Sequence, residues 1–269
     1  MNIRKAIAAC EAQYLSEGGR ASTWAGDYLK VLRHLPQDKP LTPHRLRDLV
    51  ERWEPNSRSR QRACHAAQYL AKFAGVDWTA GKLKGRYKAR PVDPRRIPTD
   101  DEIESQFDRL ENADWRWVYG SIAAYGLRPH EALRCDLEKF KQGDGKCWIP
   151  HETKTGARRV WPLHPEWFYS FRLQQSRRPP INLARDNSAI GHAATEYFSR
   201  TARLPFNLYS LRHAWARRAY LEGLDDAAAA KMMGHSLDVH QTIYRAWFDD
   251  LVLERAYQDM LAKRQPRKR

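Results

Sequence analysis

The sequence lacks the features that mark several large protein classes. Its four cysteines form no CxxC pair and no cluster with histidine, and they are widely spaced: Cys10, Cys64, Cys135 and Cys147. This spacing supports neither a zinc site nor a disulfide framework. No run approaches the roughly 18 apolar residues of a membrane-spanning helix. Charges interrupt the first apolar stretch, so it does not resemble a signal peptide. We therefore expect a cytoplasmic protein with no metal and no membrane partner.

Acidic residues are scarce relative to basic ones. The 269 residues include 47 lysines and arginines against 32 aspartates and glutamates, a formal net charge of +15. Residues 1–95 hold 19 basic and 9 acidic side chains (net +10), whereas residues 96–269 hold 28 and 23 (net +5). Such an excess attracts a polyanion, and nucleic acid is the commonest one. A hydrophobic content of 42% and an aromatic content of 11% argue against disorder.

The first third of the chain is predicted to be helical. Apolar residues recur at helical spacing in four segments: 1–17, a segment from Ser22 or Thr23 to Leu35, 42–53 and 57–74. Four helices of this length form a small bundle, and we assign residues 1–78 to it.

A basic linker is predicted over residues 79–97. Seven basic residues and three prolines occur between Thr79 and Asp100, a composition typical of a domain boundary. The stretch supplies four candidate contacts to phosphates: Lys82, Lys84, Arg86 and Lys88. An ordinary solvated charge run is the alternative interpretation.

Residues 98–269 form the second predicted domain, which combines helices with one hairpin. Thr99 precedes three acidic residues and is expected to cap a helix. Residues 115–125 suit a buried helix. Glycine-containing turns flank two short strands, at 147–150 and 159–163, and helical patterns dominate after Pro165. The prediction is a mainly α chain of two domains with a small β-hairpin.

Four local motifs follow one another in this second domain. They are YGLRPHEALRCDL, ETKTGARRVWPL, NLYSLRHAWARRAYLEG, and MMGHS with a tyrosine nine residues after its histidine. In this order they resemble the catalytic domain of the tyrosine recombinases, the phage-integrase type of site-specific recombinase. Residues 1–90 resemble, less specifically, the helical SAM-like core-binding domain of that family. The resemblance implies an enzyme that cleaves and rejoins DNA through a 3′-phosphotyrosine intermediate, with no cofactor.

The resemblance also implies a role for individual residues. Arg128 and Arg212 match the two catalytic arginines, whose planar guanidinium can hold two phosphate oxygens. Lys154 matches the hairpin lysine that protonates the departing 5′ oxygen. Tyr244 matches the nucleophile, and His235 is placed to donate to a nonbridging oxygen or to the tyrosine.

Four further residues surround this set in the motifs. Glu131 matches the acidic residue that supports the site, and His213 resembles a helix-packing histidine. Tyr209 departs from the pattern, because the family usually has histidine there and tyrosine, with an unperturbed pKa of about 10, is a poor base. Tyr209 then either orients the phosphate or the nucleophile, or the protein is slow or inactive. His240 has no counterpart and is expected at the surface.

Double-stranded DNA with specific recombination sites is the expected partner, in a nucleoid-associated protein. Most contacts should be to phosphates. Candidate DNA contacts are Arg58, Arg60 and Arg62 in the fourth helix, and Arg158 and Arg159 in the hairpin, where a structural role is the alternative. An amphipathic segment after Tyr244 is expected either to dock onto a neighbour in a homotetramer on paired sites or to pack on its own domain. The free protein is expected to be a monomer.

Two other functions remain open from the sequence. A type IB topoisomerase-like enzyme would share the chemistry and relax supercoils as a monomer. A non-catalytic DNA-binding relative is indicated by Tyr209 alone. The target sequence, and the choice among integration, excision and resolution, are not encoded in these motifs.

Overall fold

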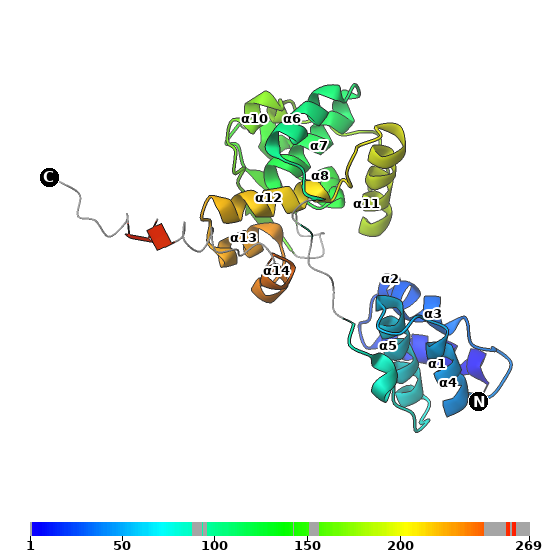
Figure 1. The fold of residues 1–269 in the computed structure, drawn as a ribbon. Coiled ribbons are helices and arrows are strands. Elements are labelled where there is room, and N and C mark those ends of the chain that lie inside the picture. Colours follow the sequence, from blue (N-terminus) through cyan, green and yellow to red (C-terminus); the bar gives the residue numbers. More distant parts are fainter. Residues whose placement is uncertain are drawn as a thin grey trace. The chain divides into compact units, whose positions relative to one another are not determined.

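The structure is a computed structural model in which the chain divides into two compact units, Met1–Ala89 and Arg90–Arg269 (Figure 1). It describes residues 2–87, 93, 96–141, 143–150, 156–244, 257–258 and 260–261. The division falls inside the predicted linker, although Ala80 is already buried in the core of the first unit. In the described part of the chain, no helix combines the length and the apolarity that a membrane span requires.

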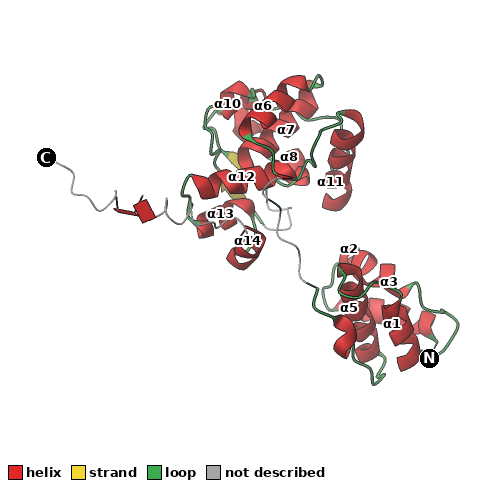
Figure 2. Ribbon diagram, in the orientation of Figure 1, coloured by secondary structure: helices red, strands yellow, loops and turns green. Residues whose placement is uncertain are grey.

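In the first unit the regular elements of the described residues are helices, which loops connect (Figure 2). Its elements are α1 (Ile3–Ser16), α2 (Ala21–Thr23), the π-helix η1 (Trp24–Leu29), α3 (Lys30–Leu32), α4 (Pro43–Glu51), α5 (Arg58–Phe73) and the 3-10 helix η2 (Gly81–Lys84). The elements α2, η1 and α3 follow one another without a break and together form the predicted second helix. The expected cap at Ser22 or Thr23 is wrong, because this helix begins at Ala21 without a side-chain cap.

An aromatic cluster holds this first bundle together. Trp24 is fully buried, and its ring stacks on Tyr28 at 5.2 Å between centroids. Tyr14 from α1 and Tyr69 from α5 pack against the same two rings. Aromatic pairs at such separations add to the stabilisation from buried area, so η1 is fixed to both α1 and α5.

The second unit is mainly helical with one small sheet (Figure 2). Its first elements are α6 (Asp100–Arg109), α7 (Ala113–Tyr125), α8 (Pro129–Arg134), α9 (Leu137–Lys141), β1 (Cys147–Ile149) and β2 (Arg158–Val160). They are followed by α10 (Trp167–Ser170), η4 (Leu173–Gln175), α11 (Asn187–Glu196), η5 (Tyr197–Thr201), α12 (Ser210–Leu221), α13 (Asp226–Met233) and α14 (Leu237–Tyr244). The strands pair antiparallel with Cys147 opposite Val160. The predicted mainly α fold with a hairpin is confirmed.

The helix α7 lies in the core of this unit and packs against α6, α8, α10 and α12. Every residue from Trp117 to Tyr125 is buried, as expected for a helix that is apolar on all sides. Asn112 caps its start and Gly126 ends it in the left-handed conformation. At α6, Thr99 caps the helix as the sequence predicted, and together with Glu102 it forms a capping box. The central helix therefore leads directly into the first arginine motif.

Candidate active site

The turn after α7 fixes the first arginine. Gly126 has φ +62°, and a Cβ built on it would lie 2.7 Å from the Trp215 ring of α12, so glycine is required there. Arg128 precedes α8, and its backbone N–H donates to Glu131 Oε2 at 2.8 Å. The Arg128 guanidinium also donates to Glu131 Oε1 at 2.8 Å. The three-residue spacing of Arg128 and Glu131 in the motif thus lets the Glu131 side chain cap the start of α8.

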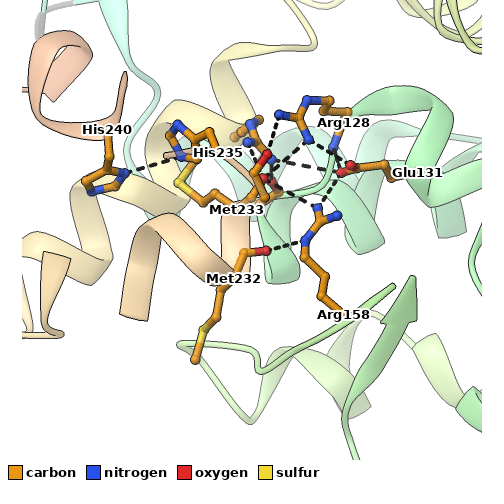
Figure 3. A network of polar contacts seen from close by, with 10 residues as sticks. Arg128, Glu131, Arg158, Met232, Met233, His235 and His240 are labelled. Carbon is orange, nitrogen blue, oxygen red and sulfur yellow. Dashed lines mark hydrogen bonds and ion pairs between the residues drawn. The ribbon is translucent and has the colours of Figure 1, made fainter. Parts of the chain in front are cut away.

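Glu131 is the centre of three guanidinium groups (Figure 3). Its side chain is 1% exposed, and Arg158 Nη2 donates to Oε2 at 2.8 Å from strand β2. Arg212 Nη1, from α12, lies 4.0 Å from the same oxygen. Burial by itself would raise the pKa of Glu131, but the charges of Arg158, Arg128 and Arg212 lower it to about 2. The carboxylate is therefore ionised throughout the physiological pH range.

The same three arginines bind the C-terminal end of α13 (Figure 3). Arg158 Nε donates to Met232 O at 2.7 Å and Arg212 Nη2 to Met233 O at 2.6 Å. The last carbonyls of a helix have no partner within it and carry partial negative charge. The guanidinium groups supply both hydrogen bonds and opposite charge.

The Gly-His turn is held through this end of α13. Gly234 is left-handed, with φ +66°, and its carbonyl accepts a 2.8 Å hydrogen bond from Arg128 Nη2. The second arm of Arg212, Nη1, reaches the carbonyl of Gly126 at 2.6 Å. Hydrogen bonds therefore connect residues of all four sequence motifs, and the second motif contributes Arg158 of the hairpin.

Tyr244 lies at the end of α14, 5% exposed, against α12. Its Oη is 3.2 Å from Nδ1 of His213. Burial raises the pKa of Tyr244 above its ordinary value, and the charge of Arg212 only partly opposes this. Burial and Arg212 lower the pKa of His213 to about 4. The expected packing histidine is therefore a neutral imidazole in contact with the proposed nucleophile.

His235 and His240 form a second pair beside the same tyrosine. His240 Nδ1 and His235 Nε2 are 3.3 Å apart (Figure 3), and the His240 ring lies 4.7 Å from that of Tyr244. The expectation of a surface position for His240 is wrong, because it is 4% exposed and packs α14 against the turn. Burial, with the charge of Arg212, lowers the pKa of His235 to about 3.

Tyr209, in the place of the usual histidine, is 39% exposed at the start of α12. Its ring centroid lies 5.2 Å from that of His213, one turn along the helix. The Tyr209 ring thus packs against His213, and His213 in turn contacts Tyr244.

Two candidate DNA contacts, Arg60 and Arg158, have their side chains buried in polar contacts within the protein. Arg60 is 7% exposed, and its Nε donates to the carbonyl of Trp53 at 2.7 Å. The Arg158 side chain is 7% exposed within the network around Glu131. Both have the structural role that charge patterns in a sequence do not distinguish from a surface role.

The other predicted basic contacts stay predictions. Arg58 and Arg159 are exposed, and so are Lys82, Lys84 and Arg86. Arg62 forms an ion pair with Asp27 at 3.1 Å. Two predicted residues, Lys88 and the hairpin lysine Lys154, lie outside the described residues, as does most of the segment after Tyr244.

Sequence reasoning missed one buried cation beside this site. Arg218 of α12 pairs with Asp100 at 2.6 Å, donates to the carbonyl of Ala123 at 2.6 Å, and lies 4.6 Å from the Trp167 ring centroid. It ties α12 to α6, α7 and α10. Arg218 stands in the basic run of the third motif, and nothing in that local sequence distinguishes it from a surface arginine. In the described ranges, no group of three or more potential ligands could hold a metal ion.

Comparison with known proteins gives relatives for both units. Residues 4–84 match the family described as the second domain of the XisA/XisC excisases. Over 202 residues the chain is 35% identical to excisase A of Nostoc sp. strain PCC 7120, covering 63% of this chain and 42% of that protein. Excisase C of the same strain is 31% identical over 206 residues, with 63% and 40% covered. The matched part thus spans about two fifths of the length of these relatives.

Solved structures give the fold. A lambda integrase dimer bound to a COC′ core site has a TM-score of 0.63 at 16% identity, covering 87% of this chain and 95% of that one. The Tn1549 transposon integrase in complex with circular intermediate DNA has a TM-score of 0.61 at 16% identity, covering 97% and 100%. At these identities the likeness shows a shared fold.

Proposed function

We propose that this chain, which has the two-domain fold of the tyrosine recombinases, is a site-specific DNA recombinase that excises or integrates a mobile element. The observation that supports this most strongly is the convergence of Arg128, Arg212 and Tyr244, from three separate motifs, around the end of α13. A helix-packing role alone does not require two arginines, Arg212 and Arg128, whose charges act on the pKa of a buried tyrosine.

The proposed reaction begins with in-line attack of Tyr244 Oη on a DNA phosphodiester. The Oη–P bond forms while the bond from phosphorus to the 5′ oxygen breaks, which leaves a 3′-phosphotyrosine and a 5′-hydroxyl. Arg128 and Arg212 stabilise the charge on the nonbridging oxygens, and fixed cations are well suited to this task. Lys154 protonates the departing oxygen. One phosphodiester replaces another, so no ATP is consumed.

His235 acts as a neutral hydrogen-bond donor in this proposal. Because its pKa is lowered to about 3, the imidazole carries no charge near pH 7. It still has one N–H to donate, either to a nonbridging oxygen or within its pair with His240. The positive charge at the phosphate comes from the arginines.

Access to the nucleophile requires a local rearrangement. Tyr244 is 5% exposed and Arg212 is 2% exposed, so a phosphate between them displaces existing contacts. Of the two catalytic arginines, Arg128 is the more open, with 20% of its side chain exposed. We infer that DNA first meets Arg128 and that α14 then shifts to expose Oη.

Double-stranded DNA and further copies of the chain are the proposed partners. The net charge of +9 over residues 1–89 (17 basic and 8 acidic side chains) supports DNA-backbone binding by the first unit. The similar lambda integrase structures include a dimer on a core site and a tetramer on a Holliday junction. We propose four protomers on paired sites. The excisase names of the relatives favour excision as the direction of the reaction.

Covalent capture tests the proposed activity directly. The full chain is incubated with a pool of nicked duplexes that contain a randomised segment, and adducts that survive denaturation are recovered and sequenced. We expect the wild-type protein to enrich one sequence, and Tyr244→Phe to bind the enriched duplex without forming an adduct. Adducts formed equally by Tyr244→Phe would contradict the assignment of the nucleophile.

The capture experiment and two further assays separate the alternatives. A non-catalytic relative would bind duplexes of the pool and form no wild-type adduct. A topoisomerase-like enzyme would relax supercoiled plasmid that lacks the enriched site. Strand exchange between two duplexes that carry the enriched site is expected only from a recombinase.

A further inference from the structure

The proposed nucleophile needs a group that accepts its proton. A phenol attacks a phosphodiester poorly until its proton is transferred, and the acceptor must lie about 2.6–3.2 Å from the oxygen. In this chain the position that usually carries histidine is Tyr209, whose hydroxyl is a poor base near neutral pH. The site therefore needs another acceptor at the Tyr244 hydroxyl.

His213 meets the geometric condition. Its Nδ1 lies 3.2 Å from Tyr244 Oη, and it reaches the tyrosine from α12, directly after Arg212. The two nearby histidines are oriented differently, because His235 Nε2 and His240 Nδ1 contact each other at 3.3 Å. A hydrogen bond in which Nδ1 accepts from Oη places the one N–H proton of the neutral His213 ring on Nε2.

We propose that His213 is the general base that takes the proton of Tyr244 during cleavage and returns it during rejoining. This inference rests on the proposed recombinase function. As the Oη–P bond forms, the phenolic proton moves to Nδ1 and the ring becomes an imidazolium. When a 5′-hydroxyl attacks the phosphotyrosine, the bond from its oxygen to phosphorus forms and its proton passes to the Lys154 amine, which cleavage left neutral. The P–Oη bond breaks, and the imidazolium protonates the leaving tyrosine. No oxidant, metal or nucleotide enters either step.

The charges around His213 are consistent with this role. Its own helix presents Arg212 and Tyr209, and α14 presents Tyr244. Burial and Arg212 keep the ring neutral, with a pKa of about 4, so it is free to accept a proton. A DNA phosphate bound at Arg212 brings a negative charge that offsets the guanidinium. The pKa of His213 therefore rises when substrate binds, which strengthens the base at the moment of attack.

A sulfur substitution in the DNA separates a base from an acid. In a duplex captured as described above, the bridging 5′ oxygen is replaced by sulfur, whose thiolate leaves without a proton donor. Adduct formation is timed on both duplexes for wild type, His213→Asn and Lys154→Ala. Asparagine retains a polar group near the Nδ1 position and cannot take up the proton. His192→Asn serves as the control, because His192 is a histidine with 78% of its side chain exposed on α11.

We expect His213→Asn to slow adduct formation by about 100-fold or more on both duplexes. The sulfur should rescue Lys154→Ala alone, and His192→Asn should match the wild type. Added imidazole should accelerate His213→Ala, where the ring is missing, and leave the wild type unchanged. Rescue also distinguishes loss of the base from weakened DNA binding, because imidazole supplies a base and does not restore the packing of the missing side chain.

Three results would overturn the inference while leaving the recombinase function in place, and a fourth would overturn both. Wild-type rates in His213→Asn would remove His213 from the reaction while leaving the recombinase function intact. Rescue of His213→Asn by sulfur would make His213 an acid. A loss of rate in Tyr209→Phe that exceeds the loss in His213→Asn would make Tyr209 the base. Absence of wild-type adducts on every duplex would overturn the recombinase function, and the proposal for His213 with it.

Discussion

At the scale of single residues, Glu131 determines how the site is built. Its side chain is 1% exposed, and a buried carboxylate is costly unless it is paired and hydrogen-bonded. Two arginines donate to it directly, and Arg212 lies within 4.0 Å. The carboxylate in turn lets three cations lie close together around one helix end. Its contribution is therefore both to stability and to the position of Arg128 and Arg212.

Stability should depend on pH through this residue. The pKa of Glu131 is about 2 in the fold, against an ordinary value of 4.5, so the ionised form is favoured by folding. The stabilisation is complete above about pH 4.5 and is lost as the pH falls toward 2. The difference corresponds to roughly 3 kcal/mol. We expect Glu131→Gln to be less stable at pH 7 and to lose less of its stability between pH 4.5 and pH 2.5.

Urea unfolding at several pH values measures this difference. Glu138→Gln is the matched control, because the Glu138 side chain is 76% exposed and its ion pair with Lys141 is on the surface. Parallel loss of stability in wild type and Glu131→Gln below pH 4.5 would show that other carboxyl groups control acid unfolding.

At the scale of elements, one face of α5 supports the first bundle while another is open to solvent. Arg58 and Arg60 are two residues apart near the start of this helix, and helical geometry turns them in different directions. Arg58 is exposed, whereas Arg60 is buried against the carbonyl of Trp53. Similar side chains on one helix therefore have different functions.

Alanine substitution should separate these two functions. Arg58→Ala is expected to weaken DNA binding and to reduce the slope of log affinity against log salt by about one, with little change in stability. Arg60→Ala should cost about 2 kcal/mol of unfolding free energy, because the carbonyl of Trp53 loses a charged donor. Salt titrations of DNA binding and urea unfolding on both variants measure the two effects. A stability loss in Arg58→Ala equal to that in Arg60→Ala would contradict the assignment of faces.

At the scale of the whole molecule, charge and folding are divided between two units. The first unit has its own apolar core, built from residues between Ile3 and Ala80. It also carries most of the positive charge, since residues 1–89 hold 17 basic and 8 acidic side chains and so contribute +9 of the net +15. The second unit contains all of the proposed catalytic residues. We therefore expect the first unit to supply much of the affinity for DNA and the second unit to carry out the chemistry.

A fragment of residues 1–89 tests this division. We expect it to unfold cooperatively on its own and to bind duplex DNA with affinity that falls steeply as salt rises. It should form no covalent adduct. Circular dichroism during thermal unfolding and fluorescence anisotropy with labelled duplex measure the two properties. A fragment that is unfolded, or whose binding is insensitive to salt, would show that the second unit is needed for both.

Much of this protein was determined by its sequence alone. Local signals placed the helices, the cap at Thr99 and the hairpin, because propensity, capping and turn preferences act over a few residues. The order of the four motifs indicated the fold, since each retains its own recognisable residues. The net charge of +15 indicated a polyanionic partner.

Only the tertiary structure decided which polar side chains are buried and what they contact. Arg58 and Arg60 look alike in the sequence, as do Arg158 and Arg159, yet one of each pair is buried. The contact of His213 with Tyr244 joins residues 31 positions apart. Burial and such contacts depend on how distant segments pack, and the same packing sets the pKa of each group, so no local pattern records them.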